Sequence, residues 1–132
     1  MIIGVGTDLT DINRIQSVLD EHGKRFINRC FTLVEKDKCE VEDALVRSAN
    51  YAKRWSAKEA CAKALGTGIA DGVFLKDIGV VNKTSGQPEI ILTGEALKVL
   101  ERMIPDGMSA KIHLSLSDEP PLTQAFVVIS AV

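Results

Sequence analysis

The sequence predicts an α+β domain in which a largely antiparallel sheet packs against one long helix and several short helices. Three observations support this fold class. The chain begins with a short apolar run, a long stretch of helical spacing follows, and the second half changes to strand-like segments separated by turn residues. The length is typical of one domain, so we expect a single domain over residues 1–132.

The first expected elements are a strand and a helix. Residues 2–7 are mostly apolar and indicate a buried strand. Thr10 is the expected cap of the next helix, because Asp11 and Asn13 suit a first helical turn. Gly23 is expected to end this helix. Apolar residues recur between these limits at helical spacing, at Ile12, Ile15 and Leu19.

Two further helices are expected before the strands of the second half. Thr32 and Glu35 fit a capping box, in which a hydroxyl and a carboxylate satisfy free backbone amides, so a short helix should follow Thr32. A long helix is predicted over residues 42–65, ended by Gly66, which adopts the left-handed conformation at little cost. The apolar stripe of this helix would consist of Leu45, Ala49, Ala52, Trp55, Ala62 and Leu65.

The second half predicts two pairs of strands around one helix. Residues 77–83 and 88–92 are rich in apolar and β-branched residues and are expected to form a hairpin. A helix is expected over residues 93–104, where a proline and a glycine stop it. Residues 110–117 alternate between apolar and polar, and residues 125–131 are almost continuously apolar, which predicts the last two strands.

Composition and charge exclude several classes of protein. The net charge of −2 argues against a nucleic-acid binder, so any basic site must be local. The odd number of cysteines, without a paired metal motif, indicates free buried thiols. No apolar run approaches the length of a membrane span, and the N-terminus lacks the basic flank of a signal peptide. We therefore expect a cytoplasmic protein that binds neither nucleic acid nor membrane.

The first candidate site follows the N-terminal strand, at Gly4, Gly6 and Asp8. A dinucleotide-binding loop would need a third glycine where Leu9 stands, so that interpretation is weak. The alternative is a carboxylate at the end of a strand, with small residues allowing a close approach to it. Asp8 could also cap the next helix, and this segment taken alone favours the capping role.

The second candidate site lies on the predicted long helix. Glu59 and Lys63 are four residues apart and share one face, which is also the pattern of an ordinary surface ion pair. Arg54 and Lys58 add two cations to the same part of the helix, shortly before Gly66. Cations beside one carboxylate and a glycine turn suit a phosphate that protein charges and a metal ion hold together.

The third candidate site lies on the strand predicted at residues 110–117. With the two-residue period of a strand, one face is apolar, and the other carries a cation, an imidazole and two hydroxyls. These polar residues are Lys111, His113, Ser115 and Ser117. A solvent-facing side of an antiparallel sheet explains the pattern equally well.

Together, the three segments resemble the holo-acyl-carrier-protein synthase family of phosphopantetheinyl transferases. The resemblance rests on residues 4–9, on residues 54–63 with the glycine turn at 66–68, and on residues 113–117. It covers nearly the whole chain, and the middle segment is the most specific. The resemblance implies the fold of that family and a homotrimer with the nucleotide site between neighbouring subunits.

The resemblance also implies an activity and a set of site residues. The chain would move the 4'-phosphopantetheine group of coenzyme A onto a serine of apo-acyl carrier protein and release adenosine 3',5'-bisphosphate, in support of fatty acid biosynthesis. Asp8 and Glu59 would bind Mg²⁺ together with the diphosphate of coenzyme A, and Lys63 would complete the catalytic group. The coenzyme A site would consist of Arg54, Lys58, Lys63, Gly66 and His113.

The carrier protein is acidic, so the resemblance implies a basic docking surface on the first helix. Arg14 fits this role best, and Lys24 and Arg25 are further candidates. Charges that merely keep the protein in solution would explain Lys24 and Arg25 equally well. Asp118 stands where some relatives carry a second histidine, and its position in a turn predicts a structural role.

Two other functions fit parts of the pattern. A magnesium-dependent hydrolase of nucleotide diphosphates would use the same carboxylates without a protein partner. A non-catalytic module would bind acidic proteins through Arg14 and Arg25. The combination of phosphate and metal motifs favours the transferase over both.

Overall fold

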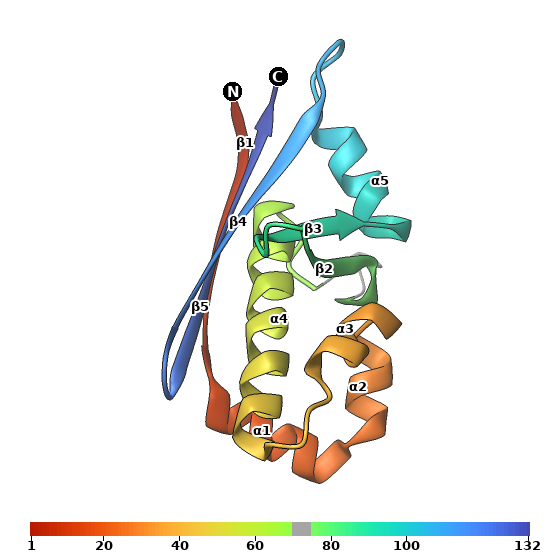
Figure 1. Cartoon of the computed structure of the whole chain (residues 1–132). Coiled ribbons are helices and arrows are strands. Elements are labelled where there is room, and N and C mark those ends of the chain that lie inside the picture. Colours follow the sequence, from red (N-terminus) through yellow and green to blue (C-terminus); the bar gives the residue numbers. More distant parts are fainter. Residues whose placement is uncertain (70–74) are drawn as a thin grey trace.

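The computed structural model describes residues 1–69 and 75–132, and its elements follow the order that the α+β class predicts (Figure 1). The helices are α1 (Ile12–His22), α2 (Lys24–Cys30), α3 (Leu33–Cys39), α4 (Ala44–Ala64), α5 (Gly94–Met103) and a short 3-10 helix at Leu75–Asp77. The strands are β1 (Ile2–Asp11), β2 (Ile78–Asn82), β3 (Pro88–Leu92), β4 (Ala110–Glu119) and β5 (Leu122–Ala131).

The main sheet has three antiparallel strands in the order β1-β5-β4. The strand β5 lies in the middle, because Ala125 pairs with Asp8 on one side and with Leu116 on the other. Strands β1 and β4 are therefore the two edges of this sheet, and β2 and β3 form a separate hairpin. Helix α4 lies along one face of the main sheet, and none of the described elements covers the opposite face (Figure 1).

Helix α4 and strand β1 pack backbone against backbone at two glycines. A Cβ atom at Gly6 would overlap the carbonyl oxygen of Ala60 and would lie 2.8 Å from the backbone nitrogen of Ala64. A Cβ atom at Gly4 would overlap the carbonyl oxygen of Ala64. Only glycine permits this approach. Because Asp8 lies two residues further along β1, the same contact sets how close Asp8 comes to α4.

Strand β1 is longer than the sequence predicts. Its pairing with β5 continues to Asp11, so Asp8 lies within the strand and Thr10 is buried in it. The predicted cap at Thr10 is wrong, since Asp11 Oδ1 accepts the first-turn hydrogen bond from the Asn13 amide, at 2.8 Å. The capping box of Thr32 at the start of α3 is confirmed.

Two helices differ from the sequence pattern. The segment after Gly23 predicts no helix, yet α2 forms there without a side-chain cap and buries Ile27 and Cys30. Packing therefore holds this short helix. On α4 the predicted apolar stripe is right at Ala52, which is fully buried, and wrong at Leu45, which is 76% exposed. The buried residues of α4 begin only at Ser48, so its first turn projects beyond the core.

The core consists of two apolar clusters. One joins α4 to the main sheet, the hairpin and α5, and the other joins α4 to α1, α2 and α3. The predicted free, buried thiols are confirmed at Cys30, Cys39 and Cys61. Burial raises the pKa of Cys39 to about 11 and the pKa of Cys61 to about 12. Both thiols therefore stay protonated at neutral pH and serve as core packing.

Candidate active site

Asp8 lies on the face of β1 that packs against α4. Its Oδ2 accepts hydrogen bonds from the hydroxyl of Thr10 at 2.6 Å and from the hydroxyl of Ser56 at 3.0 Å. Its Oδ1 lies 3.6 Å from the ammonium of Lys63, and the Asp8 side chain is 14% exposed. These contacts fix the carboxylate and leave part of it open to a ligand.

Glu59 projects from α4 close enough to Asp8 for the two charges to interact. Burial raises the pKa of Glu59 and the like charge of Asp8 raises it further, whereas Lys63 and Arg14 lower it. The structure thus brings Asp8, Glu59 and Lys63 together, with Arg14 nearby. Two neighbouring carboxylates that repel each other form a site that a divalent cation would stabilise.

Lys63 reaches from α4 to the edge strand of the sheet. Its Nζ donates to the carbonyl oxygen of Thr7 at 2.9 Å, and its side chain is half exposed. The helix ends directly after it, where the Gly66 amide donates to the carbonyl oxygen of Lys63 at 3.0 Å. Gly66 has a positive φ of 83°, which favours glycine at this turn. The predicted neighbours Lys63 and Gly66 therefore lie together at the open end of the site.

Lys58 points into the core and does not join this group. Its Nζ donates to Glu35 Oε1 at 2.8 Å and to the carbonyl oxygens of Leu75 at 2.9 Å and Ile78 at 2.6 Å. Burial lowers the pKa of Lys58, while the carboxylate of Glu35 raises it. All three donors of the ammonium are used inside the protein. Contrary to the sequence prediction, we therefore do not assign Lys58 to the coenzyme A site.

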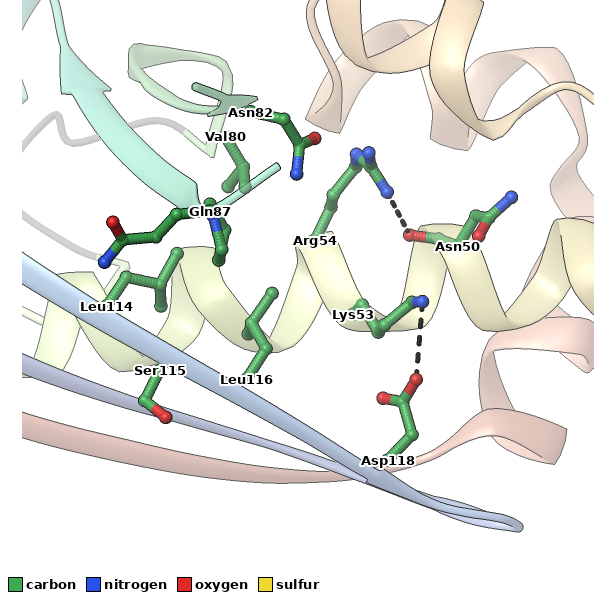
Figure 2. Close-up of a pocket in the computed structure, with 11 residues that line it drawn as sticks. Asn50, Lys53, Arg54, Val80, Asn82, Gln87, Leu114, Ser115, Leu116 and Asp118 are labelled. Carbon is green, nitrogen blue, oxygen red and sulfur yellow. Dashed lines mark hydrogen bonds and ion pairs between the residues drawn. The ribbon is translucent and has the colours of Figure 1, made fainter. Parts of the chain in front are cut away.

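Arg54 lines a separate cavity of about 520 Å³ between α4, the β2–β3 hairpin and the inner face of β4. Figure 2 shows its side chain extending from α4 toward Asn82 of the hairpin. One guanidinium nitrogen donates to the carbonyl oxygen of Asn50 at 3.2 Å, while the buried Nε has no partner among the described residues. A buried donor without a partner is costly, and an anionic ligand in this cavity would satisfy it.

His113 lies on the uncovered face of the main sheet, on the edge strand β4. Its Nε2 is 3.0 Å from the hydroxyl of Ser130 on β5. Lys83, Lys111 and His113 line a second hollow of about 540 Å³. Within one chain, His113 and Asp8 therefore lie on opposite faces of the sheet and on opposite edge strands.

The predicted docking residues are exposed on α1 and α2. Arg14 lies on α1, and Lys24 and Arg25 lie on α2. Because the charge of Arg14 acts on Glu59, this basic surface begins beside the carboxylates. It continues into a hollow of about 310 Å³ lined by His22, Arg25, Phe26 and Arg29.

Sequence reasoning missed the residues that hold the site residues in place. Thr10 and Ser56 donate hydrogen bonds to Asp8, and the sequence position of each could have indicated this role. Thr10 shares a strand face with Asp8, and Ser56 lies one helical turn before Glu59. Lys53, whose charged group is 3.3 Å from that of Asp118 in the wall of the Arg54 cavity, was also missed, and Asp118 was expected only to have a structural role.

The described part of the chain, residues 1–69 and 75–132, contains no group of three or more histidine, cysteine, aspartate or glutamate side chains that could hold a metal ion. Any ion at Asp8 and Glu59 would therefore need further ligands from water or substrate. None of the helices in this part of the chain is both long enough and apolar enough to cross a bilayer.

The fold and this site define a class of protein. A fixed carboxylate pair, an adjacent lysine and a glycine turn at a helix end suit an enzyme that transfers a phosphoryl-type group. Residues 4–117 match the family model of the 4'-phosphopantetheinyl transferase superfamily. The chain belongs to this superfamily, which confirms the resemblance.

Relatives that resemble this chain over nearly its whole length share one name. The holo-[acyl-carrier-protein] synthase of Methylorubrum extorquens is 57% identical over 100% of this chain and 96% of its own. The crystal structure of that synthase from Neisseria meningitidis superimposes with a TM-score of 0.82 and 38% identity, over 98% of this chain and 99% of the other. The structure of the synthase of Bacillus anthracis in complex with CoA (3',5'-ADP) superimposes with a TM-score of 0.77 and 32% identity, over 98% of this chain and 96% of the other.

Proposed function

We propose that this protein is a holo-[acyl-carrier-protein] synthase. It transfers the 4'-phosphopantetheine group of coenzyme A to a serine of apo-acyl carrier protein and supports fatty acid biosynthesis in the cytoplasm. The observation that carries the proposal is the group of Asp8, Glu59 and Lys63 in a chain that is 57% identical, over its whole length, to a relative of that name.

Mg²⁺ fits the carboxylate pair of this group. The ion is bound in proteins by one or two carboxylates and completes its shell with water and phosphate oxygens. Asp8 and Glu59 supply two carboxylates, and burial followed by the charge of Asp8 raises the pKa of Glu59. When bound there, Mg²⁺ would neutralise charge on the diphosphate of coenzyme A and make its phosphorus easier to attack.

The residues of the chain position and neutralise the reacting groups. The serine hydroxyl releases its proton to solvent as its oxygen forms a bond to the phosphorus that carries the pantetheine arm, and the bond from that phosphorus to the bridging oxygen breaks. Adenosine 3',5'-bisphosphate leaves. Lys63 stabilises the negative charge of the leaving phosphate, and Gly66 lets the backbone approach it. Thr10 and Ser56 keep Asp8 in place, so that little reorganisation is needed during the reaction.

The nucleotide part of coenzyme A is assigned to the Arg54 cavity and to the hollow beside His113. The unpartnered Nε of Arg54 supports this assignment. Arg54 and Glu59 are five residues apart on α4, which places them about 140° apart around the helix. The two halves of the site therefore lie on different sides of α4 and near opposite edges of the sheet.

A neighbouring subunit would bring the two halves together. If the β1 edge of one chain meets the β4 edge of the next, the contact is head-to-tail, and such contacts can close into rings. The uncovered face of the sheet offers apolar area for this contact at Val5, Leu9 and Phe126, which are 51%, 62% and 44% exposed. We assign a homotrimer, in which each coenzyme A lies between two subunits.

The carrier protein docks on the basic surface of α1 and α2. Arg14, Lys24 and Arg25 face solvent there, and opposite charges on the partner would accelerate the encounter. The charge of Arg14 reaches Glu59. A carrier bound at Arg14 would therefore present its serine beside the carboxylates.

Intact-mass spectrometry of apo-acyl carrier protein tests this function. With the protein, coenzyme A and Mg²⁺, we expect the carrier mass to increase by one phosphopantetheine, and we expect chelation of the metal to prevent the increase. Asp8→Asn should lower the rate by about 100-fold or more, because it removes one of the two carboxylates that would hold Mg²⁺ beside the reacting phosphate. Asp106→Asn, at an exposed aspartate after α5, is the matched control.

Three other results would contradict the proposal. Release of phosphopantetheine into solution without a carrier would indicate a hydrolase. Carrier binding that is unaffected by coenzyme A and Mg²⁺ would indicate a docking module. Normal turnover by Asp8→Asn would remove the carboxylate pair from the reaction.

A further inference from the structure

One ion pair forms part of the wall of the Arg54 cavity. The Nζ of Lys53 on α4 lies 3.3 Å from Oδ2 of Asp118 on β4, and the two side chains are 31% and 34% exposed (Figure 2). Lys53, Arg54 and Asp118 all line the cavity of about 520 Å³. A ligand in this cavity therefore meets two cations, one of which already has a carboxylate beside it.

The two members of the pair are held to different degrees. Asp118 Oδ1 accepts a hydrogen bond at 2.8 Å from the hydroxyl of Thr123, which is almost fully buried. Lys53 has no polar partner except Asp118 among the residues the structure describes. A lysine ammonium sits on a flexible four-carbon stem. Lys53 is therefore the member that can move toward a ligand, while Asp118 stays in place.

A phosphate in the cavity competes with Asp118 for Lys53. Phosphate oxygens and carboxylate oxygens are alike in accepting strong hydrogen bonds from an ammonium. The carboxylate of Asp118 also repels an anion that enters the cavity. The pair thus weakens anion binding twice, by occupying a cation and by adding a negative charge.

We propose that Lys53 is a further phosphate-binding residue of the nucleotide cavity. We propose also that Asp118, by pairing with Lys53, lowers the affinity of the cavity for the nucleotide. Lys53 moves from Asp118 to a phosphate when the nucleotide binds and returns to Asp118 when adenosine 3',5'-bisphosphate leaves. This inference rests on the proposed function, because it assumes that the Arg54 cavity takes the nucleotide of coenzyme A.

The arrangement suits an enzyme that must release a highly charged product. In many enzymes the release of product limits the rate, so tight binding of the product slows turnover. When Asp118 re-forms its ion pair with Lys53, the free energy needed for the bisphosphate to dissociate from the cavity is lower. Asp118 lies within β4 and not in the turn that its sequence position predicts, and it has a role in exchange of the nucleotide as well as in bonding to Thr123 of β5.

Calorimetric titration of the full-length protein with adenosine 3',5'-bisphosphate, in Mg²⁺ and low salt, tests the inference. Asp118→Asn removes the charge but keeps an oxygen for the Thr123 hydroxyl, and we expect it to tighten binding by roughly two- to fivefold. Lys53→Met keeps most of the aliphatic stem, and we expect it to weaken binding by a similar factor. Unchanged or weaker binding by Asp118→Asn would overturn the inference, as would unchanged binding by Lys53→Met.

Three controls separate this role from structural or general charge effects. Glu119→Gln removes one negative charge from the next residue, which points to the other face of the strand, and it should leave the affinity unchanged. The gain from Asp118→Asn should shrink in high salt and should be absent with uncharged adenosine as the ligand. An equal gain for adenosine would show a structural effect and would overturn the inference.

Arg54→Ala distinguishes failure of this inference from failure of the proposed function. If Arg54→Ala weakens binding of the bisphosphate but Asp118→Asn does not tighten it, the cavity takes the nucleotide and only the role of the Lys53–Asp118 pair is wrong. If Arg54→Ala has no effect, the cavity is not the nucleotide site, and both assignments fail.

Discussion

Burial makes the ionisation of Glu59 unfavourable, and the like charge of Asp8 on the neighbouring strand adds to this cost. The free protein bears this cost in the absence of any ligand. Lys63 and Arg14 reduce it only in part, since the pKa of Glu59 stays raised. At the scale of single residues, stability is therefore reduced at the place where we propose that Mg²⁺ binds.

A substitution at Glu59 tests this cost. A carboxyl group with a raised pKa favours folding below its unfolded value of about 4.5, and this contribution is lost as the pH rises through the folded pKa. In metal-free protein we expect Glu59→Gln to raise the melting temperature at pH 7 by about 2–5 °C. The gain should disappear toward pH 4, and calorimetry across this range in chelator would measure it.

The same variant should lose its response to metal. Mg²⁺ should raise the melting temperature of the unmodified protein, because it binds only the folded state. It should have little effect on Glu59→Gln. Glu101→Gln, on the exposed side of α5, should behave like the unmodified protein. A gain in stability that persisted at pH 4 would show that ionisation of Glu59 is not its cause.

The sequence predicts the positions of some site residues correctly and of others wrongly. Glu59 and Lys63 could be predicted from the motif and its helical spacing, and the structure places both beside Asp8. Lys58 belongs to the same motif, yet it points into the core, because consecutive helical residues point about 100° apart. Its partner Glu35 lies in the capping box of α3, and sequence spacing gives no sign that a cap residue also pairs with a buried lysine.

At the scale of elements, the contact of β1 with α4 decides the geometry of the site. Gly6 stands between Gly4 and Asp8, and the backbone of α4 fills the space where its side chain would be. A methyl group there would push the helix that carries Glu59 away from the strand that carries Asp8. Packing and catalysis therefore depend on the same contact.

We expect Gly6→Ala to lower the free energy of unfolding by about 3 kcal/mol, near the upper end of the cost of overpacking. Transfer activity should fall more than the loss of folded protein explains, because the carboxylates move apart. Chemical denaturation and the mass assay would measure the two effects. Gly79→Ala in β2 is the matched control, since its Cβ would lie 3.5 Å from the carbonyl oxygen of Ile91, an ordinary contact.

Elements also differ in how well their sequence predicts them. The strand and helix segments of the second half follow their patterns, because turn residues bound each of them. Helix α2 lacks both a capping side chain and a long apolar stripe, so only its packing against the core reveals it. The extension of β1 to Asp11 depends on its pairing with β5, which lies more than 100 residues away in the sequence.

At the scale of the whole molecule, the two parts of the site lie near opposite edges of one sheet. Sequence patterns could not reveal this, because the polar face of β4 suits solvent and a subunit contact equally well. The arrangement leads to a test with mixed subunits. Asp8→Ala and Arg54→Ala variants should each be poorly active alone when coenzyme A is limiting.

After subunit exchange in an equal mixture, about one quarter of the shared sites should combine an intact Asp8 with an intact Arg54 from a neighbour, so activity should recover toward that fraction. The intact-mass assay, run on the mixture and on each variant alone, would measure the recovery. Activity that stayed at the average of the two variants would mean that each chain contains a complete site.

If coenzyme A lies between two subunits, as we propose, the catalytic rate depends on the concentration of the protein. A chain that meets no neighbour can be fully folded and still have no complete place for coenzyme A. Dilution should therefore lower the specific activity before it unfolds the protein, and a cell that makes too few copies would activate its carrier proteins more slowly than the copy number alone suggests.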